Sequence, residues 1–411
     1  MAEPPSGSQA EDLNRKQGEE PGTESRQTLR RMTGVNESWW RGLVVPGLSL
    51  LLALIVGGFI IMVTDVDAWR VMGEDPVAAI GEMLNDVWVA YRALFTGAFG
   101  SVRAISETLF TATPLVLAGL AVAIGFQTGL FNIGARGQML MGGLAAVWVG
   151  LHVDLPAVLH ITLAILAAIV AGGIWGGITG LLKARTGAHE VITTIMLNFV
   201  AAFFVLWALK TPAFQAEGSN LPQSAPLPET VRLPPIFGEQ YRVNIGLIIA
   251  LAAVLFVYWL MYRSTLGFEF RATGYSPSAS VYAGMNVSFL LTAVMFISGG
   301  LAGVAGATMT QGLPPYTVTS NFAGTIGFDA IALALLGRSH PFGVAWAGLL
   351  FGALIAGGRS MQAVAGVTVD LVIVMQALII VFIAAPELVR AIFRLKKADT
   401  EPTQLTKGWG A

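Results

Sequence analysis

The 411-residue sequence contains no cysteine. This absence excludes thiolate catalysis, iron–sulfur clusters and zinc sites of the CxxC type. Histidine is also scarce, and none of the four histidines has a second His, Asp or Glu at metal-ligand spacing on one helical face (His152, His160, His189 and His340). We therefore expect no metal and no cofactor.

Charged residues are also scarce. Only 12% of the residues are Asp, Glu, Lys or Arg, about half of the roughly 25% typical of a soluble domain, whereas 55% are hydrophobic. The formal net charge of −1 offers no basic surface to nucleic acid. The composition excludes a soluble enzyme, a disordered protein and a disulfide-stapled secreted domain, and it predicts a polytopic protein of the lipid bilayer.

Lysine is rare, and none of the six lysines follows a glycine (Lys16, Lys183, Lys210, Lys396, Lys397 and Lys407). A nucleotide-binding loop requires Gly-Lys-Ser/Thr, so any ATP hydrolysis must come from a partner. There is also no G-x-S-x-G motif in a strand–turn–helix context, and hence no support for a membrane-embedded hydrolase. We expect no catalytic residue and no enzyme activity.

Long apolar windows are abundant, and most of them are near the roughly 20 residues that span a bilayer. We count ten spans, and the third and eighth are short enough to be broken or half-helices (43–63, 109–126, 138–152, 158–182, 191–209, 245–261, 287–309, 326–337, 342–358 and 369–387). No window alternates apolar and polar residues as a barrel strand does. The sequence predicts an all-α helical membrane bundle.

The two ends of the chain differ in composition from the middle. Residues 1–40 are polar and predict a disordered tail without a cleavable signal peptide, 41–390 form the transmembrane domain, and 391–411 form a C-terminal tail. If the N-terminus is cytoplasmic, 16 of the 24 Lys and Arg residues lie inside and 7 outside. This excess predicts that both termini are cytoplasmic.

Three connections are long. Residues 64–108 and the Pro-rich 210–244 are expected outside, as solvated connections or as a docking surface for an external partner. Within the first, 88–100 is half-apolar and could lie flat on the outer face. Residues 262–286 are expected in the cytoplasm, where a short helix along the membrane would offer a surface to a soluble partner, although an ordinary connecting loop is the alternative.

Small residues four apart let helix backbones approach closely in lipid. The sequence is glycine-rich in three spans, and these glycines predict tight helix packing rather than a site (Gly172, Gly176 and Gly180 in 158–182; SGGLAGVAGA, 298–307, in 287–309; Gly348 and Gly352 in 342–358). The two halves of the chain also resemble each other, since an Ile-Gly pair opens a short apolar segment in each and a charge follows two residues later. That charge is Arg136 in 133–138 and Asp329 in 326–331. Such corresponding short segments indicate the central pathway of a transporter.

Uncharged polar residues within apolar segments can bind a hydroxyl-rich solute or pair between helices. We expect Asn132, Gln138, Asn198 and Asp329 to line the solute path.

Four separate stretches, in order, resemble signature segments of the permease subunits of ABC importers (129–146, 181–201, 264–287 and 327–343). The most similar group is the nucleoside and simple-sugar branch of the basic membrane lipoprotein type, which is related to ribose and branched-chain amino-acid permeases. The resemblance covers about residues 105–390. Three positions depart from the pattern, since the family commonly has Glu at Arg136, Asn at His189 and Asn near Ser276.

The resemblance implies a multi-pass permease of the bacterial inner membrane that moves a nucleoside or a simple sugar. Its partners would be an ATP-binding subunit, a second permease (the same chain or a paralogue) and an external substrate-binding lipoprotein. Residues 264–284 would contain the helix that couples to the ATPase, with six residues matching the pattern (Gly267, Arg271, Gly274, Tyr282, Ala283 and Gly284). The alternative is a stand-alone secondary transporter or channel for a small polar solute.

Overall fold

The computed structural model describes residues 38–73, 75–216 and 218–394. Most of the predicted tail 1–40, and the predicted C-terminal tail beyond residue 394, lie outside the described residues. Within the described parts the chain is helical, with isolated β-bridges and no named strand. The predicted all-α fold is confirmed.

Each of the ten predicted spans lies within or largely overlaps one long or short helix: α3 (Ser38–Thr64), α6 (Val102–Gln127), α7 (Ala135–His152), α8 (Ala157–Thr186), α9 (Glu190–Ala208), α10 (Gly246–Arg263), α13 (Val287–Gly312), α14 (Ile326–Leu336), α15 (Pro341–Ala365) and α16 (Val369–Ala384). Seven of these are long and apolar enough to cross a membrane. The 11-residue α14 is one of the two segments that the sequence predicts to be short.

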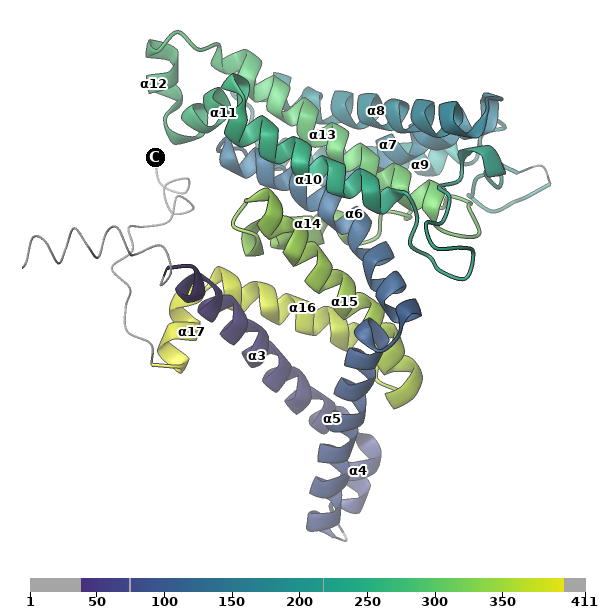
Figure 1. Cartoon of the computed structure of the whole chain (residues 1–411), viewed down its shortest axis with the longest axis vertical. Coiled ribbons are helices and arrows are strands. Elements are labelled where there is room, and N and C mark those ends of the chain that lie inside the picture. The colour runs from purple at the N-terminus through teal and green to yellow at the C-terminus, as the bar shows by residue number, and fades with distance from the viewer. Residues whose placement is uncertain (1–37, 74, 217, 395–411) are drawn as a thin grey trace, which may run out of the picture.

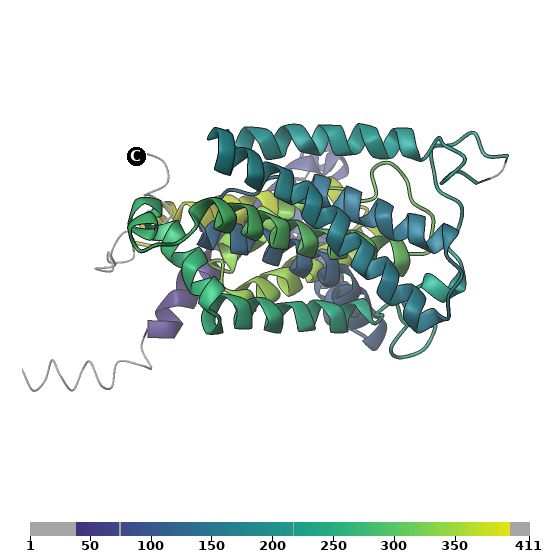
Figure 2. The same ribbon diagram turned by 90° about the horizontal axis from the view of Figure 1, so that it is seen from above.

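The remaining helices lie in the connections: α4 (Val66–Val71), α5 (Pro76–Phe99), the 3₁₀ turn η1 (Glu229–Val231), α11 (Thr265–Tyr275), α12 (Pro277–Tyr282) and α17 (Pro386–Ile392). Figures 1 and 2 show α11 and α12 at one end of the bundle and the 210–244 loop at the other. We call these the α11–α12 end and the loop end. Helices α8 and α13 run antiparallel between them, because Gly180 packs on Leu291 while Gly172 packs on Gly303.

Helix α6 is the centre of the bundle. In its most apolar window 78% of the residues are buried, against 28% for α8 and α9. It packs against α10, α13, α14 and α15, as expected of a helix that is apolar on all sides. A segment that contacts so many others can transmit a displacement between the two ends of the molecule.

The predicted glycine packing is found between α8 and α13. A Cβ atom on Gly176 would lie 3.1 Å from the Cα of Gly299, and a Cβ on Gly172 would lie 2.8 Å from the Cα of Gly303. The two backbones therefore touch without side chains between them, as small residues four apart allow.

The connection 64–108 is largely helical, which the sequence did not predict. Helix α5 begins at Pro76, where the Asp75 side chain accepts hydrogen bonds from the backbone N–H groups of Val77 and Ala78. It packs against α15, where Gly357 lies against the Leu94 backbone. The opposite face leaves Trp88 and Phe95 exposed. Residues 88–100 are thus mostly the second half of α5, and Figure 1 shows that helix running crosswise to α8 and α13. Its position relative to a bilayer stays a prediction.

Candidate functional site

At the α11–α12 end, two serines define two short helices. Ser264 caps α11, accepting a hydrogen bond from the Gly267 N–H, and Ser276 both ends α11 and caps α12, accepting from the Ala279 N–H. Pro277 follows at the first position of α12, where a missing N–H costs nothing. The expected short helix in 262–286 is confirmed, and there are two of them.

The inner face of α11 packs through glycine. Gly267 lies against the backbone of Leu260 in α10, and a Cβ on Gly274 would lie 2.5 Å from the carbonyl oxygen of Gln127 and 2.9 Å from the carbonyl carbon of Thr128. Neither position has room for a methyl group. Helix α11 is therefore held directly against the end of α6.

The outer face is apolar and bare. Phe268, Tyr275, Val281 and Tyr282 are all exposed, and Tyr282 is exposed to 93%. Tyr282 lies at the end of α12 with the exposed Ala283 and Gly284 beside it. Of the six predicted coupling residues, Gly267 and Gly274 thus face the bundle, Tyr282, Ala283 and Gly284 face away from it, and Arg271 lies half-buried between. Aromatic residues of this kind are enriched where one protein docks on another.

Gln127 joins three elements behind this surface, a role that the sequence analysis missed. Its Nε2 donates a hydrogen bond to the Tyr262 hydroxyl at 3.2 Å and another to the Ser339 carbonyl. The Arg271 guanidinium lies 5.2 Å from the centroid of the Tyr262 ring. The end of α6, the end of α10 and the turn before α15 therefore meet at the Gln127 amide, and α11 joins them through the contact of Arg271 with Tyr262. The only sequence signal was a polar residue at the end of an apolar run.

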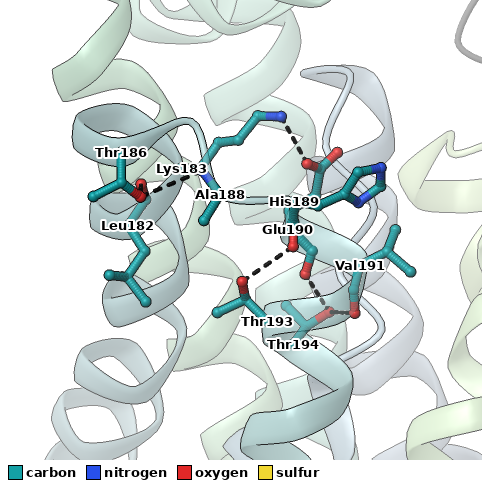
Figure 3. Close-up of polar contacts among 9 residues, drawn as sticks. All are labelled: Leu182, Lys183, Thr186, Ala188, His189, Glu190, Val191, Thr193 and Thr194. Carbon is teal, nitrogen blue, oxygen red and sulfur yellow. Dashed lines mark hydrogen bonds and ion pairs between the residues drawn. The ribbon is translucent and has the colours of Figure 1, made fainter.

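The connection between α8 and α9 lies at the same end and is held by polar contacts (Figure 3). Lys183 Nζ lies 2.9 Å from Glu190 Oε2, and the Thr194 hydroxyl donates to the Glu190 carbonyl at 2.7 Å. Gly187 ends α8 with a φ of +69°, a conformation that glycine adopts without strain. Glu190 also begins α9, where a negative charge stabilises the helix N-terminus.

Three of the four predicted path residues are brought together in the middle of the bundle, and their polar atoms are satisfied by the protein. The Asn132 Nδ2 donates to Gln138 Oε1 at 2.9 Å and to Ser298 Oγ at 2.7 Å, while Gln138 Nε2 donates back to Asn132 Oδ1 at 3.0 Å. Ser298 in turn donates to the Ala121 carbonyl at 2.6 Å. The amides therefore pair α7 with α6 and α13.

Asn198 of α9 holds the same region from the other side. Its Oδ1 accepts from the Gly137 N–H at 2.8 Å, and its Nδ2 donates to the Ile133 carbonyl at 2.9 Å. Asp329 stands apart on α14, half-buried, and accepts from Thr325 at 2.9 Å. A role of these four residues in the solute path stays a prediction, while the first three fix the non-helical segment before α7.

The two similar segments from the two halves touch each other. A Cβ on Gly327 would lie 2.5 Å from the backbone nitrogen of Arg136. Arg136 Nη2 donates to Asn321 Oδ1 at 2.7 Å. The start of α14 and the start of α7 therefore lie side by side, as expected if both border a central pathway.

A small hollow of about 90 Å³, partly open to solvent, lies toward the loop end between α6, α13, α14 and α15. It is lined by Phe110, Thr111, Thr113, Pro114, Asn244, Thr308, Met309, Leu313, Ile326 and Arg359. The sequence did not predict this hollow, because its walls come from five separate segments and none of its residues is unusual for a packed helix.

A helical bundle with seven helices of membrane-spanning length among the described residues, and an exposed apolar surface at one end, is consistent with a membrane transport protein. The family described as the branched-chain amino acid transport system permease component matches residues 104–384. The chain belongs to this family.

Three curated relatives are similar over most of the chain. The guanosine ABC transporter permease protein NupP of Bacillus subtilis (strain 168) is 38% identical over 86% of this chain and 97% of its own length. The glucose ABC transporter permease protein TsgB13 of Haloferax volcanii is 38% identical over 85% of this chain and 88% of its own. The nucleoside ABC transporter permease protein NupB of Lactococcus lactis subsp. cremoris is 35% identical over 76% of this chain and 88% of its own length. No solved structure matches significantly.

Proposed function

We propose that this chain is the membrane-spanning subunit of an ATP-driven importer that moves a nucleoside or a simple sugar across the inner membrane. The observation that carries the proposal is the α11–α12 end, where an exposed apolar surface is backed by glycine contacts to the central helix α6. A partner that binds this surface and changes shape would displace α6 directly. Nucleoside is the first choice of solute, because two of the three similar permeases are named for guanosine or nucleosides, and a sugar is the second.

The proposal includes three partners. An ATP-binding subunit would dock on α11 and α12, a second permease would complete the path, and an external lipoprotein would deliver the solute at the loop end. The α11–α12 end would face the cytoplasm, and so would both termini. Supporting this orientation, α17 and the start of α3 lie toward the α11–α12 end in both views (Figures 1 and 2).

The test is uptake of labelled guanosine and glucose by vesicles that contain the whole importer, with and without ATP. Changing Tyr282 to Arg should abolish ATP-driven uptake, because it places a charge in the centre of the docking surface, whereas Tyr282→Phe should retain uptake. The exposed aromatic Trp346, on α15, serves as the control site, and Trp346→Phe should leave uptake unchanged. Uptake by Tyr282→Arg at the normal rate would refute the docking assignment.

A further inference from the structure

Helix α5 has three different faces along its length. One face is buried against α3 and α15 and consists of small or aliphatic side chains (Ala79, Met83, Ala90, Ala93, Leu94 and Ala98). A second face is polar and exposed (Glu82, Asn85, Arg92 and Thr96). Between these two faces, large apolar side chains recur every three, four or seven residues, and all of them are exposed (Val77, Ile80, Leu84, Trp88, Phe95 and Phe99). We call this third face the α5 stripe.

The α5 stripe follows the whole helix without a polar interruption. Its first and last residues, Val77 and Phe99, are separated by about 33 Å of helix at 1.5 Å per residue. Trp88 in the middle of the stripe is 66% exposed. An apolar surface of this extent is normally covered by another protein or by lipid.

The contacts of α5 give its depth relative to the membrane-spanning helices. Both α3 and α15 run from the α11–α12 end toward the loop end (Figure 1). Gly58 of α3 packs against Val87, and Gly357 of α15 packs against Leu94. These glycines precede the ends of α3 and α15 by six and eight residues, which corresponds to about 9 Å and about 12 Å.

Two contacts that lie seven residues apart on α5 are therefore at similar depths. This is the geometry of a helix that runs nearly parallel to the membrane plane, close to the ends of the spans. At that depth the lipid headgroups meet the acyl chains, and amphipathic helices bind membranes there by burying their apolar face.

The neighbouring surface also fits lipid. Helix α3 is long and apolar enough to cross a membrane, and it has exposed apolar side chains four residues apart on one face (Leu51, Ile55, Phe59 and Val63). The α5 stripe lies at the level where this row on α3 ends. Trp69 of α4 and Trp88 of α5 are both exposed at this level, and tryptophan is enriched where a membrane protein meets the lipid headgroups.

The charges of α5 indicate which lipid it fits. The helix carries two acidic side chains, Glu82 and Asp86, and one basic side chain, Arg92. Basic clusters attract anionic headgroups, and α5 has none. The apolar side chains must therefore provide the attraction, and zwitterionic lipid is sufficient for it.

We propose that α5 is an in-plane membrane anchor, with the α5 stripe among the acyl chains of zwitterionic lipids and the polar face in water. The leaflet is the one at the loop end, which is the outer leaflet in the proposed orientation. The anchor holds α3 and α15 at a fixed depth near their outer ends. It involves neither the solute nor ATP.

The cysteine-free sequence allows a direct test with single probes. Leu84→Cys and Phe95→Cys place a thiol in the α5 stripe. Asn85→Cys and Thr96→Cys are the matched controls, because each lies one residue further on, on the polar face of the same turn. Each thiol is labelled with the fluorophore bimane, and the full chain is reconstituted into phosphatidylcholine vesicles, both alone and within the whole importer.

Two quenchers report the surroundings of each probe. Phosphatidylcholine with brominated acyl chains should quench the bimane at Leu84→Cys and Phe95→Cys several times more strongly than at Asn85→Cys and Thr96→Cys. Iodide in the water should give the reverse order. Adding anionic phosphatidylglycerol should change neither result. Ile80→Cys and Glu82→Cys replace any pair that does not reconstitute.

Three results would overturn the proposal. Equal quenching by iodide at both faces would place the α5 stripe in water. Shielding of the stripe probes from both quenchers within the whole importer would show that a second subunit covers the stripe. Quenching by brominated lipid that requires phosphatidylglycerol would show that anionic headgroups hold the helix. Uptake is not the readout, so a failure of the proposed function would leave this test unaffected.

Discussion

Gly274 shows how a single residue can connect the two parts of the proposed mechanism. It belongs to α11, whose outer face is bare, yet its own Cα faces the backbone of Gln127 and Thr128. Gln127 in turn donates its amide hydrogens to Tyr262 and Ser339. A displacement of α11 therefore reaches α6 directly through the backbone, and it reaches α10 and the turn before α15 through the Gln127 amide.

We expect Gly274→Ala to uncouple the importer, because the added methyl group would lie 2.5 Å from the Gln127 carbonyl oxygen and α11 would have to move away from α6. ATP hydrolysis by the assembled complex should persist, while solute uptake per ATP hydrolysed falls about tenfold or more. Both rates are measured on the same proteoliposomes. Gly81→Ala in α5 is the control, because a Cβ there meets nothing within 4 Å. Equal uptake by the two variants would contradict the role of Gly274.

His340 predicts a pH dependence of stability at the same junction. Its ring lies 5.3 Å from the Tyr262 ring and 5.8 Å from the Phe342 ring, and burial lowers the pKa of His340 below its ordinary value. As the pH falls, His340 is therefore protonated in the unfolded chain before it is protonated in the folded chain. The contribution of neutral His340 to the free energy of unfolding is full above about pH 6.5 and declines below it. The midpoint of thermal unfolding in detergent should drop less between pH 7.5 and 5.5 for His340→Asn than for the unchanged chain. The same drop in both would show that His340 does not contribute.

At the scale of residues, the sequence predicted which polar residues are unusual, but it did not predict which groups they bond. Asn132, Gln138 and Asn198 were recognised as unusual polar groups in apolar segments, and the structure shows that each is paired. Whether an amide pairs between helices or faces a path depends on which helices are adjacent, and hydropathy alone does not contain that information. Gln127 and the hollow were missed for the same reason.

At the scale of elements, apolar runs were sufficient to locate a helix at each of the ten predicted positions, and seven of these helices have the length and composition to cross a bilayer. They were not sufficient for α5. Only one face of that helix packs on α15, and the other leaves Trp88 and Phe95 exposed, so its residues read as a half-apolar connection. The caps that define it, Asp75 followed by Pro76, are the signal that could have found it.

The contact between α8 and α13 gives a prediction about stability. Gly299→Ala should destabilise the chain by about 1–3 kcal/mol, the usual cost of overpacking, because Gly299 lies against the backbone of Gly172 and Gly176. Gly177→Ala is the matched variant on α8, since its Cβ would meet Phe296 at an ordinary 3.6 Å, and it should be neutral or stabilise by up to about 1 kcal/mol. Unfolding in detergent by heat or denaturant measures both. A larger loss for Gly177→Ala would contradict the backbone contact.

At the scale of the whole molecule, the proposal requires that the chain be inactive alone. Reconstituted without partners, it should move neither guanosine nor glucose under a proton or sodium gradient, and ATP should have no effect, because the sequence has no Gly-Lys-Ser/Thr motif to hold nucleotide. Addition of the ATP-binding subunit, the second permease and the external lipoprotein should restore ATP-dependent uptake. Gradient-driven uptake by the chain alone would support the alternative of a secondary transporter.

The bare backbone seam of α8 and α13 has a mechanical consequence. Interdigitated side chains resist sliding, because they clash when one helix moves along the other. Two helices in contact through glycine are held by dispersion, and the contact has few side chains that would clash. Separation of the pair is therefore costly, and translation by a fraction of a turn is cheap. Such a joint favours shear over hinge bending.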